Sequence, residues 1–95
     1  MNFCTVTGTV RHPDGKPIGL VTFTPQHTGF VGQAFVSRTE VRVIPNDSGQ
    51  FSVSLAPSEV VGTYLVKMGE EKFRVTVPTA IAVRFATLLD KSQEN

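Results

Sequence analysis

The chain has no tryptophan, one tyrosine and one cysteine among its 95 residues. A single cysteine cannot form a disulfide within the chain, which excludes the disulfide-framed domains typical of small secreted proteins. Sugar-binding sites commonly stack their ligand on Trp or Tyr rings, so the scarcity of both argues against one. No apolar run reaches the ~20 residues of a membrane span, and the first residues lack the basic-then-apolar layout of a signal peptide. We therefore expect a soluble protein made in a cytoplasm.

Neither positive nor negative charge predominates in the sequence. Nine basic and eight acidic residues leave a formal net charge of +1 at pH 7. Nucleic acids and anionic membranes select a concentrated positive field, so neither is expected as a partner. The length suits one domain with a modest core. We assign residues 1–90 to that domain and residues 91–95 to a polar tail.

The sequence does contain a series of short segments with period-two alternation, separated by residues that favour turns. Residues 50–56 alternate most cleanly, with Phe51, Val53 and Leu55 on one side and serines on the other. Turn residues rich in Pro, Asp, Asn and Gly occupy 13–17, 46–49 and 69–71. The predicted strands cover residues 3–11, 18–24, 34–44, 50–56, 63–68 and 72–77, with a possible seventh at 81–85.

This pattern predicts an all-β protein, an antiparallel β-sandwich of Ig-like or prealbumin-like type with six to seven strands. The two sheets are expected to bury their apolar sides against each other. Cys4, near the start of the first strand, is interpreted as a small buried side chain, with pairing between chains as the alternative. The predicted core consists of Val6, Val10, Val21, Phe23, Val41, Val43, Phe51, Val53, Leu55, Tyr64, Val66, Phe73, Val75 and Val77.

Three segments are less regular. Residues 26–33 show no period and are predicted to form a surface loop with Phe30 exposed. The long strand predicted at 34–44 would place Arg38, Glu40 and Arg42 on one face. Residues 81–89 fit either a strand or a helical stripe, and we favour a short extended piece followed by a helical turn.

The residues that carry catalytic or ligand chemistry are scattered. His12 and His27 lie in or beside turns without the three or four converging ligands that zinc needs. Cys4 has no basic cluster or helix N-terminus beside it to lower its pKa, so a Cys–His nucleophile is not supported.

The acidic residues suit structural positions. Asp14 and Asp47 fall where a turn Asp bonds its own backbone, and Glu70 and Glu71 suit a solvated hairpin tip better than an acid/base pair. The glycines form no phosphate-binding loop. The sequence thus predicts no catalytic residue, no metal and no cofactor, and the protein is not expected to be an enzyme.

Several of these motifs resemble a known family. Four segments are similar to the carboxypeptidase-regulatory-like, prealbumin-type β-sandwich: residues 6–10 (VTGTV), 13–17 (PDGKP), 47–53 (DSGQFSV) and 62–67 (GTYLVK). Four others are similar to the small β-sandwich module in virion proteins of tailed bacteriophages: residues 21–25 (VTFTP), 41–43 (VRV), 73–78 (FRVTVP) and 83–89 (VRFATLL).

The resemblance implies a structural protein of the virion, assembled in the host cytoplasm. Because the chain ends soon after the closing segment, we expect an adaptor, collar or head-decoration protein that docks on head or tail subunits and forms a homo-oligomer in the particle. The alternative is a ligand-binding or adhesive module for carbohydrate or peptide, such as a receptor-binding component of a tail fibre. The candidate partner-binding residues are Phe30, Arg38, Glu40, Arg42, Phe85, Leu88 and Leu89.

Overall fold

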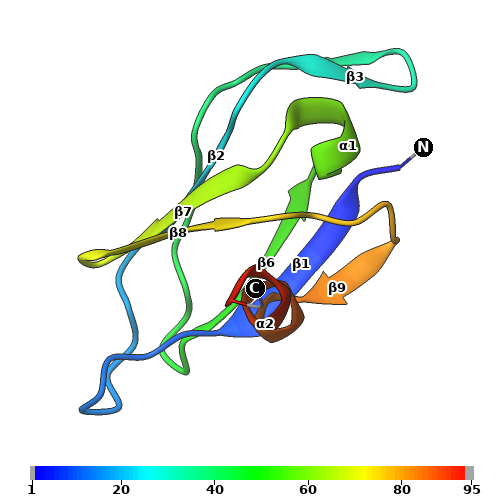
Figure 1. Cartoon of the computed structure of the whole chain (residues 1–95). Coiled ribbons are helices and arrows are strands. Elements are labelled where there is room, and N and C mark those ends of the chain that lie inside the picture. Colours follow the sequence, from blue (N-terminus) through cyan, green and yellow to red (C-terminus); the bar gives the residue numbers. More distant parts are fainter. Residues whose placement is uncertain (1, 94–95) are drawn as a thin grey trace.

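Two β-sheets form the body of the protein in a computed structural model, which describes the backbone of residues 2–93 and the side chains of residues 2–89 (Figure 1). The first sheet has three strands in the order β6–β1–β9: Gln50–Leu55, Cys4–Thr9 and Ala82–Arg84. The second has four in the order β5–β2–β7–β8: Val41–Val43, Val21–Pro25, Tyr64–Met68 and Glu71–Val75. The remaining elements are the hairpin of β3 (Gly29–Val31) and β4 (Ala34–Val36) and the helices α1 (Ser58–Val61) and α2 (Phe85–Gln93).

The predicted all-β sandwich is confirmed, with nine strands in the described residues rather than six or seven. Every strand pair is antiparallel except β1 and β9, which run parallel. Val6 of β1 lies opposite Val53 of β6 and beside Val83 of β9. Because side chains alternate across a strand, this register directs one row of valines from the three-stranded sheet toward the other sheet.

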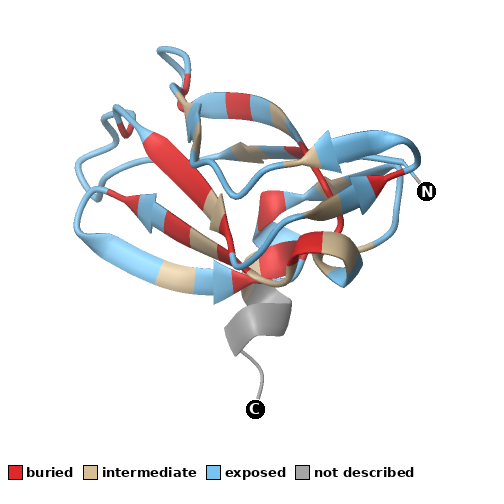
Figure 2. Ribbon diagram, turned by 90° about the horizontal axis from the view of Figure 1, so that it is seen from above, coloured by how far each residue is buried: buried red, intermediate tan, exposed pale blue. Residues whose placement is uncertain are grey.

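The core lies between the sheets, where Figure 2 shows the buried residues gathered. Ten of the fourteen predicted core residues are buried, and the other four, Val41, Val43, Val53 and Phe73, pack partly buried against them. Cys4 is buried, as predicted. The sequence prediction did not include seven further core residues, which come from turns, helices and strand ends: Ile18, Val31, Ala56, Val61, Met68, Phe85 and Leu88.

A cluster of phenylalanine rings joins the two sheets and α2. Phe85, at the start of α2, lies 6.0 Å from Phe23 of β2 and 5.4 Å from Phe51 of β6 between ring centroids. Gly8 of β1 permits this approach, because a Cβ at that position would lie 2.7 Å from the Cβ of Phe85. The absence of a side chain at Gly8 therefore allows the helix to close against the sheet.

The structure of residues 26–44 differs from the prediction, which was a loop at 26–33 followed by a long strand at 34–44. Residues 29–36 form the β3–β4 hairpin, which closes over Gly32 at φ 60, and the chain leaves strand geometry at 37–40 before β5. Gly29 lies against α1, where a Cβ would come within 2.5 Å of a Val60 side-chain carbon. The hairpin forms because it can pack on α1, a tertiary contact with no local sequence signal (Figure 1).

The turns follow the predicted chemistry with one exchange of residue. Asp14 Oδ1 accepts a hydrogen bond from the Lys16 backbone at 3.0 Å, as expected. In the second turn the acceptor is Asn46 rather than Asp47: its Oδ1 accepts from the backbone of Ser48 and of Gln50 at 2.9 and 3.0 Å. Asn and Asp serve equally well in such turns, so sequence alone does not separate them.

The C-terminal segment is a short strand, β9, followed directly by α2, as favoured from the sequence. The helix is longer than one turn, because it continues to Gln93. The expected boundary between residues 90 and 91 therefore falls within a helix. The frayed tail predicted for residues 91–95 lies partly outside the described residues.

Candidate functional site

The side chains that could bind a metal ion do not converge in the part of the chain that the structure describes. No group of three or more His, Cys, Asp and Glu residues is close enough to hold a metal ion there. Cys4 is fully buried, and burial raises the pKa of its thiol, so the reactive thiolate is disfavoured. Tyr64 is buried too; its hydroxyl donates to the Ala56 carbonyl at 2.7 Å, and burial raises its pKa to about 12. Both side chains therefore belong to the interior of the fold.

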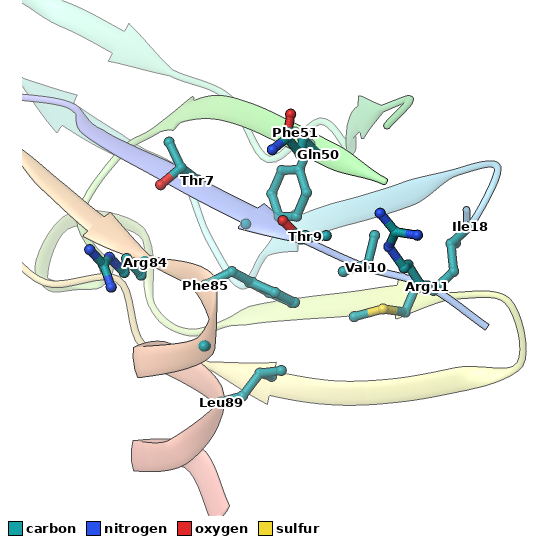
Figure 3. A pocket seen from close by; sticks show the side chains of 13 residues that line it. Thr7, Thr9, Val10, Arg11, Ile18, Gln50, Phe51, Arg84, Phe85 and Leu89 are labelled. Atoms are coloured by element: carbon teal, nitrogen blue, oxygen red, sulfur yellow. The ribbon is translucent and has the colours of Figure 1, made fainter. Parts of the chain in front are cut away.

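A cavity of about 760 Å³ opens at one end of the sandwich, beside α2 (Figure 3). Apolar side chains make up most of its wall, and polar groups of β1 and β6 complete it. The apolar lining consists of Val10, Ile18, Phe51, Met68, Phe85, Ala86 and Leu89. A volume of this size, with an apolar wall and few polar groups, is typical of pockets for small ligands or single side chains.

Two arginines flank this end cavity. Arg11 donates to the Gly15 carbonyl at 3.2 Å and to the Ser48 carbonyl at 2.8 Å, so its guanidinium holds two turns together. The side chain of Arg84 is exposed and makes no hydrogen bond or ion pair with another described residue. Figure 3 shows the two arginines at opposite sides of the cavity. The end cavity thus pairs an apolar wall with two arginines, neither of which forms an ion pair with a side chain that the structure describes.

A second surface lies on the β3–β4 hairpin. Phe30 and Phe35 are directly opposite in the register, and their rings meet edge to face with centroids 5.5 Å apart. The two side chains are 61% and 62% exposed. A groove of about 310 Å³ continues from Phe35 past Val36 to Phe3, which is also exposed. We call Phe30, Phe35 and Phe3 the hairpin surface.

The predicted charged face is not a single strand face. Arg38 lies in the loop between β4 and β5, Glu40 just before β5, and only Arg42 within a strand. Glu40 and Arg42 form an ion pair with 3.1 Å between Oε2 and Nε, whereas Arg38 has no such partner among the described residues. The strand predicted at 34–44 breaks after β4, so its alternation does not extend through these residues.

The apolar candidates at the C-terminus lie inside the fold. Phe85 and Leu88 are each 2% exposed, and Leu89 is half-buried in the wall of the end cavity. Their helical spacing reflects packing of α2 on β1 and β8. Their contact with a partner stays a prediction, but in this fold Phe85 and Leu88 are covered by the chain's own core.

Sequence reasoning identified Phe30 and missed Phe35. The available signal was weak: Phe35 was assigned to a long strand, where an aromatic residue suits a core. The pairing of β3 with β4 sets the two rings side by side, and that pairing depends on Gly32 and on contacts with α1.

Neither a protein-family model nor a curated protein sequence matches the chain. Within the described residues, no helix has the length and apolar character needed to cross a membrane.

Proposed function

We propose that the protein is a non-enzymatic structural component of a tailed-phage virion, which docks on other head or tail subunits through the hairpin surface. The observation that carries this proposal is the contact between Phe30 and Phe35. Two large rings lie together, more than half exposed, on a hairpin that packs on α1. Exposed aromatic residues that lie together are typical of protein-binding surfaces.

The energetics support a role in docking. Full burial of a Phe side chain contributes roughly 1.5–3 kcal/mol, so covering both rings would supply a substantial part of a moderate affinity. The hairpin is a two-stranded sheet, and β5 is an edge strand, so backbone groups at these edges are unpaired in the described structure. A neighbouring subunit can add a strand to such an edge and place its own apolar side chains against Phe30 and Phe35.

The virion setting follows from the resemblance of the sequence motifs to small β-sandwich modules of phage particles. The fold fits this setting, because the sandwich presents sheet edges, loops and an aromatic hairpin to its surroundings. Within a particle the protein would serve as an adaptor, collar or decoration subunit and would be present in several copies.

Incorporation into particles tests the proposal. The chain should be detected by mass spectrometry in particles purified from the phage that encodes it, at a fixed ratio to the major head or tail protein. Phe30→Ser and Phe35→Ser should fold normally and be lost from the particles. Ile81→Ser is the matched control, because Ile81 is equally apolar and 78% exposed but lies outside the hairpin surface. Absence of the wild-type chain from particles, or equal incorporation of all three variants, would overturn the proposal.

The end cavity favours a second candidate, a ligand-binding or adhesive module such as a receptor-binding component of a tail fibre. Its apolar wall suits a peptide side chain better than a sugar. Ala86 is exposed and lines the cavity, so Ala86→Trp should fill it without disturbing the core. Binding of a peptide or glycan on an array by the wild-type monomer, lost in Ala86→Trp, would support this candidate. Absence of any array signal would exclude it.

A further inference from the structure

The outer side of the four-stranded sheet collects basic residues from three strands. The register sets Arg42 of β5 opposite Thr22 of β2, Thr22 opposite Lys67 of β7, and Lys67 opposite Lys72 of β8. Arg74 occupies the same side one row further along β8, opposite Leu65. We call Arg42, Lys67, Lys72 and Arg74 the basic face.

The positive charge of this face is not balanced locally. Four of the nine basic residues of the chain lie here, and among the side chains of residues 2–89 the one acidic group paired with them is Glu40, on Arg42. Lys67 and Lys72 are directly opposite, an arrangement that destabilises an antiparallel pair. A sheet surface that served only to keep the protein soluble would carry both positive and negative side chains, as the rest of this nearly neutral chain does. An opposed lysine pair without a partner therefore indicates a ligand of opposite charge.

Thr22 supplies a second observation in the centre of the same row. It is 6% exposed, and its hydroxyl is buried with no hydrogen-bond partner among the described residues. Thr22, Arg42 and Lys67 line a hollow of about 480 Å³ on this side of the sheet, together with Glu40, the ion-pair partner of Arg42. A carboxylate drawn between the two cationic side chains would lie over a hydroxyl that has a proton to donate and no acceptor.

The basic face is short and bounded by acidic residues. Neighbouring strands are ~4.8 Å apart, so the row from β5 to β8 spans only about 14 Å. Glu40 adjoins one end. At the other, Glu70 lies in the turn between β7 and β8, and Glu71 begins β8 next to Lys72. A long polyanion such as nucleic acid would meet these carboxylates beyond the row, whereas a compact acidic segment would not. Leu65 and Leu20 beside the row add apolar contact area of the kind protein side chains use.

We propose that the basic face binds an acidic segment of another protein, one that presents three or four carboxylates within about 14 Å. The inference rests on the proposed function only in taking the partner to be a protein, and it uses a different surface from the hairpin. The partner's carboxylates would offset the repulsion between Lys67 and Lys72. Relief of this repulsion would therefore add to the free energy of binding.

Fluorescence anisotropy with a labelled octaglutamate peptide at low salt tests the inference. The wild-type chain should bind the peptide, and Lys67→Glu or Lys72→Glu should weaken binding by about tenfold or more, because each reversal removes an attraction and adds a repulsion. Lys16→Glu is the matched control: it makes the same charge change at an exposed residue that is not part of the basic face, and it should bind as the wild type does. The melting temperature of Lys72→Glu should equal or exceed that of the wild type, which separates lost binding from lost folding.

Three results would overturn the inference: no binding of the peptide by the wild type, equal weakening by Lys16→Glu, or binding of duplex DNA or phosphatidylglycerol vesicles in place of the peptide. The proposed function fails separately. Phe30→Ser should leave peptide binding unchanged, because Phe30 lies outside the basic face. If the wild-type chain binds the peptide but is absent from virions, the inference is retained and the virion role is rejected. The opposite outcome is also distinguishable. If the chain enters particles through Phe30 but Lys72→Glu binds the peptide as the wild type does, the virion role is retained and the inference about the basic face is rejected.

Discussion

The rings of Phe51 and Phe85 meet edge to face, with centroids 5.4 Å apart and planes inclined by 74°. Phe51 belongs to β6 and Phe85 begins α2, so this contact ties the first sheet to the C-terminal helix. Both rings also contact Phe23 of the second sheet. The stability of the sandwich is therefore concentrated where three elements meet.

Phe51→Ala should destabilise the protein by about 3–5 kcal/mol, because it removes a buried ring and leaves a space that its neighbours cannot fill. Urea or thermal unfolding measures this change, and most of the variant is expected to be unfolded at room temperature. Ser52→Ala, at the exposed neighbouring position, is the control and should melt like the wild type. A melting temperature for Phe51→Ala within a few degrees of wild type would contradict the core placement.

Gly8→Ala should destabilise the protein by roughly 1–3 kcal/mol, because its methyl group would collide with Phe85 and push α2 away from β1. Gly19→Ala is the control: no atom lies within 4 Å of a Cβ built there, and the residue has no positive φ. That change should leave stability equal or slightly higher, because it restricts the unfolded chain. Equal melting of the two variants would show that α2 does not pack as described.

Lys72→Glu should stabilise the free protein by about 0.2–1 kcal/mol, because it replaces the repulsion with Lys67 by an attraction across the β7–β8 hairpin. The gain should shrink at high salt, which screens exposed charges. Urea unfolding at low and high salt measures both effects. The double variant Lys67→Glu/Lys72→Glu again has two like charges opposite each other and should lose the added stability. A salt-independent change would mean that the two side chains do not interact.

Tyr64 should make stability fall between about pH 10 and pH 12. Burial raises the pKa of its hydroxyl from 10.0 to about 12, so the folded state holds a proton that the unfolded state releases first. The stabilisation is complete below pH 10 and is lost as the pH rises through 12. Tyr64→Phe should cost about 1–2 kcal/mol at neutral pH, because the Ala56 carbonyl loses its donor, and should flatten this alkaline slope. An unchanged slope in the variant would assign it to other groups.

Arg38→Glu should leave folding intact and weaken assembly. Arg38 is exposed in the loop beside the hairpin and has no ion-pair partner among the described residues, so its replacement removes no contact within the chain. Thermal melting and incorporation into particles provide the two measurements. Lys16→Glu should incorporate like the wild type. Normal incorporation of Arg38→Glu would remove this residue from the docking surface.

Part of the candidate site was readable from the sequence. Phe30 stood out because an aromatic residue lay in a segment without periodicity, and Lys72 and Arg74 alternated with apolar residues of a clear strand. Phe35 could not be recognised, since its exposure depends on the hairpin that sets it beside Phe30. The repulsion between Lys67 and Lys72 could not be predicted either, because it depends on how β7 is aligned with β8.

Outside residues 26–44 and 58–61, the sequence by itself determined where the chain runs straight, where it turns and which side of each strand is apolar, because these follow from alternation and from the local chemistry of residues such as Asp14 and Gly49. Only the tertiary structure decided that β9 pairs parallel to β1, that α2 places Phe85 in the core and that a hairpin forms over α1. These features depend on contacts between residues far apart in the chain. Their free energy arises only when the sheets have come together, and no local pattern records it.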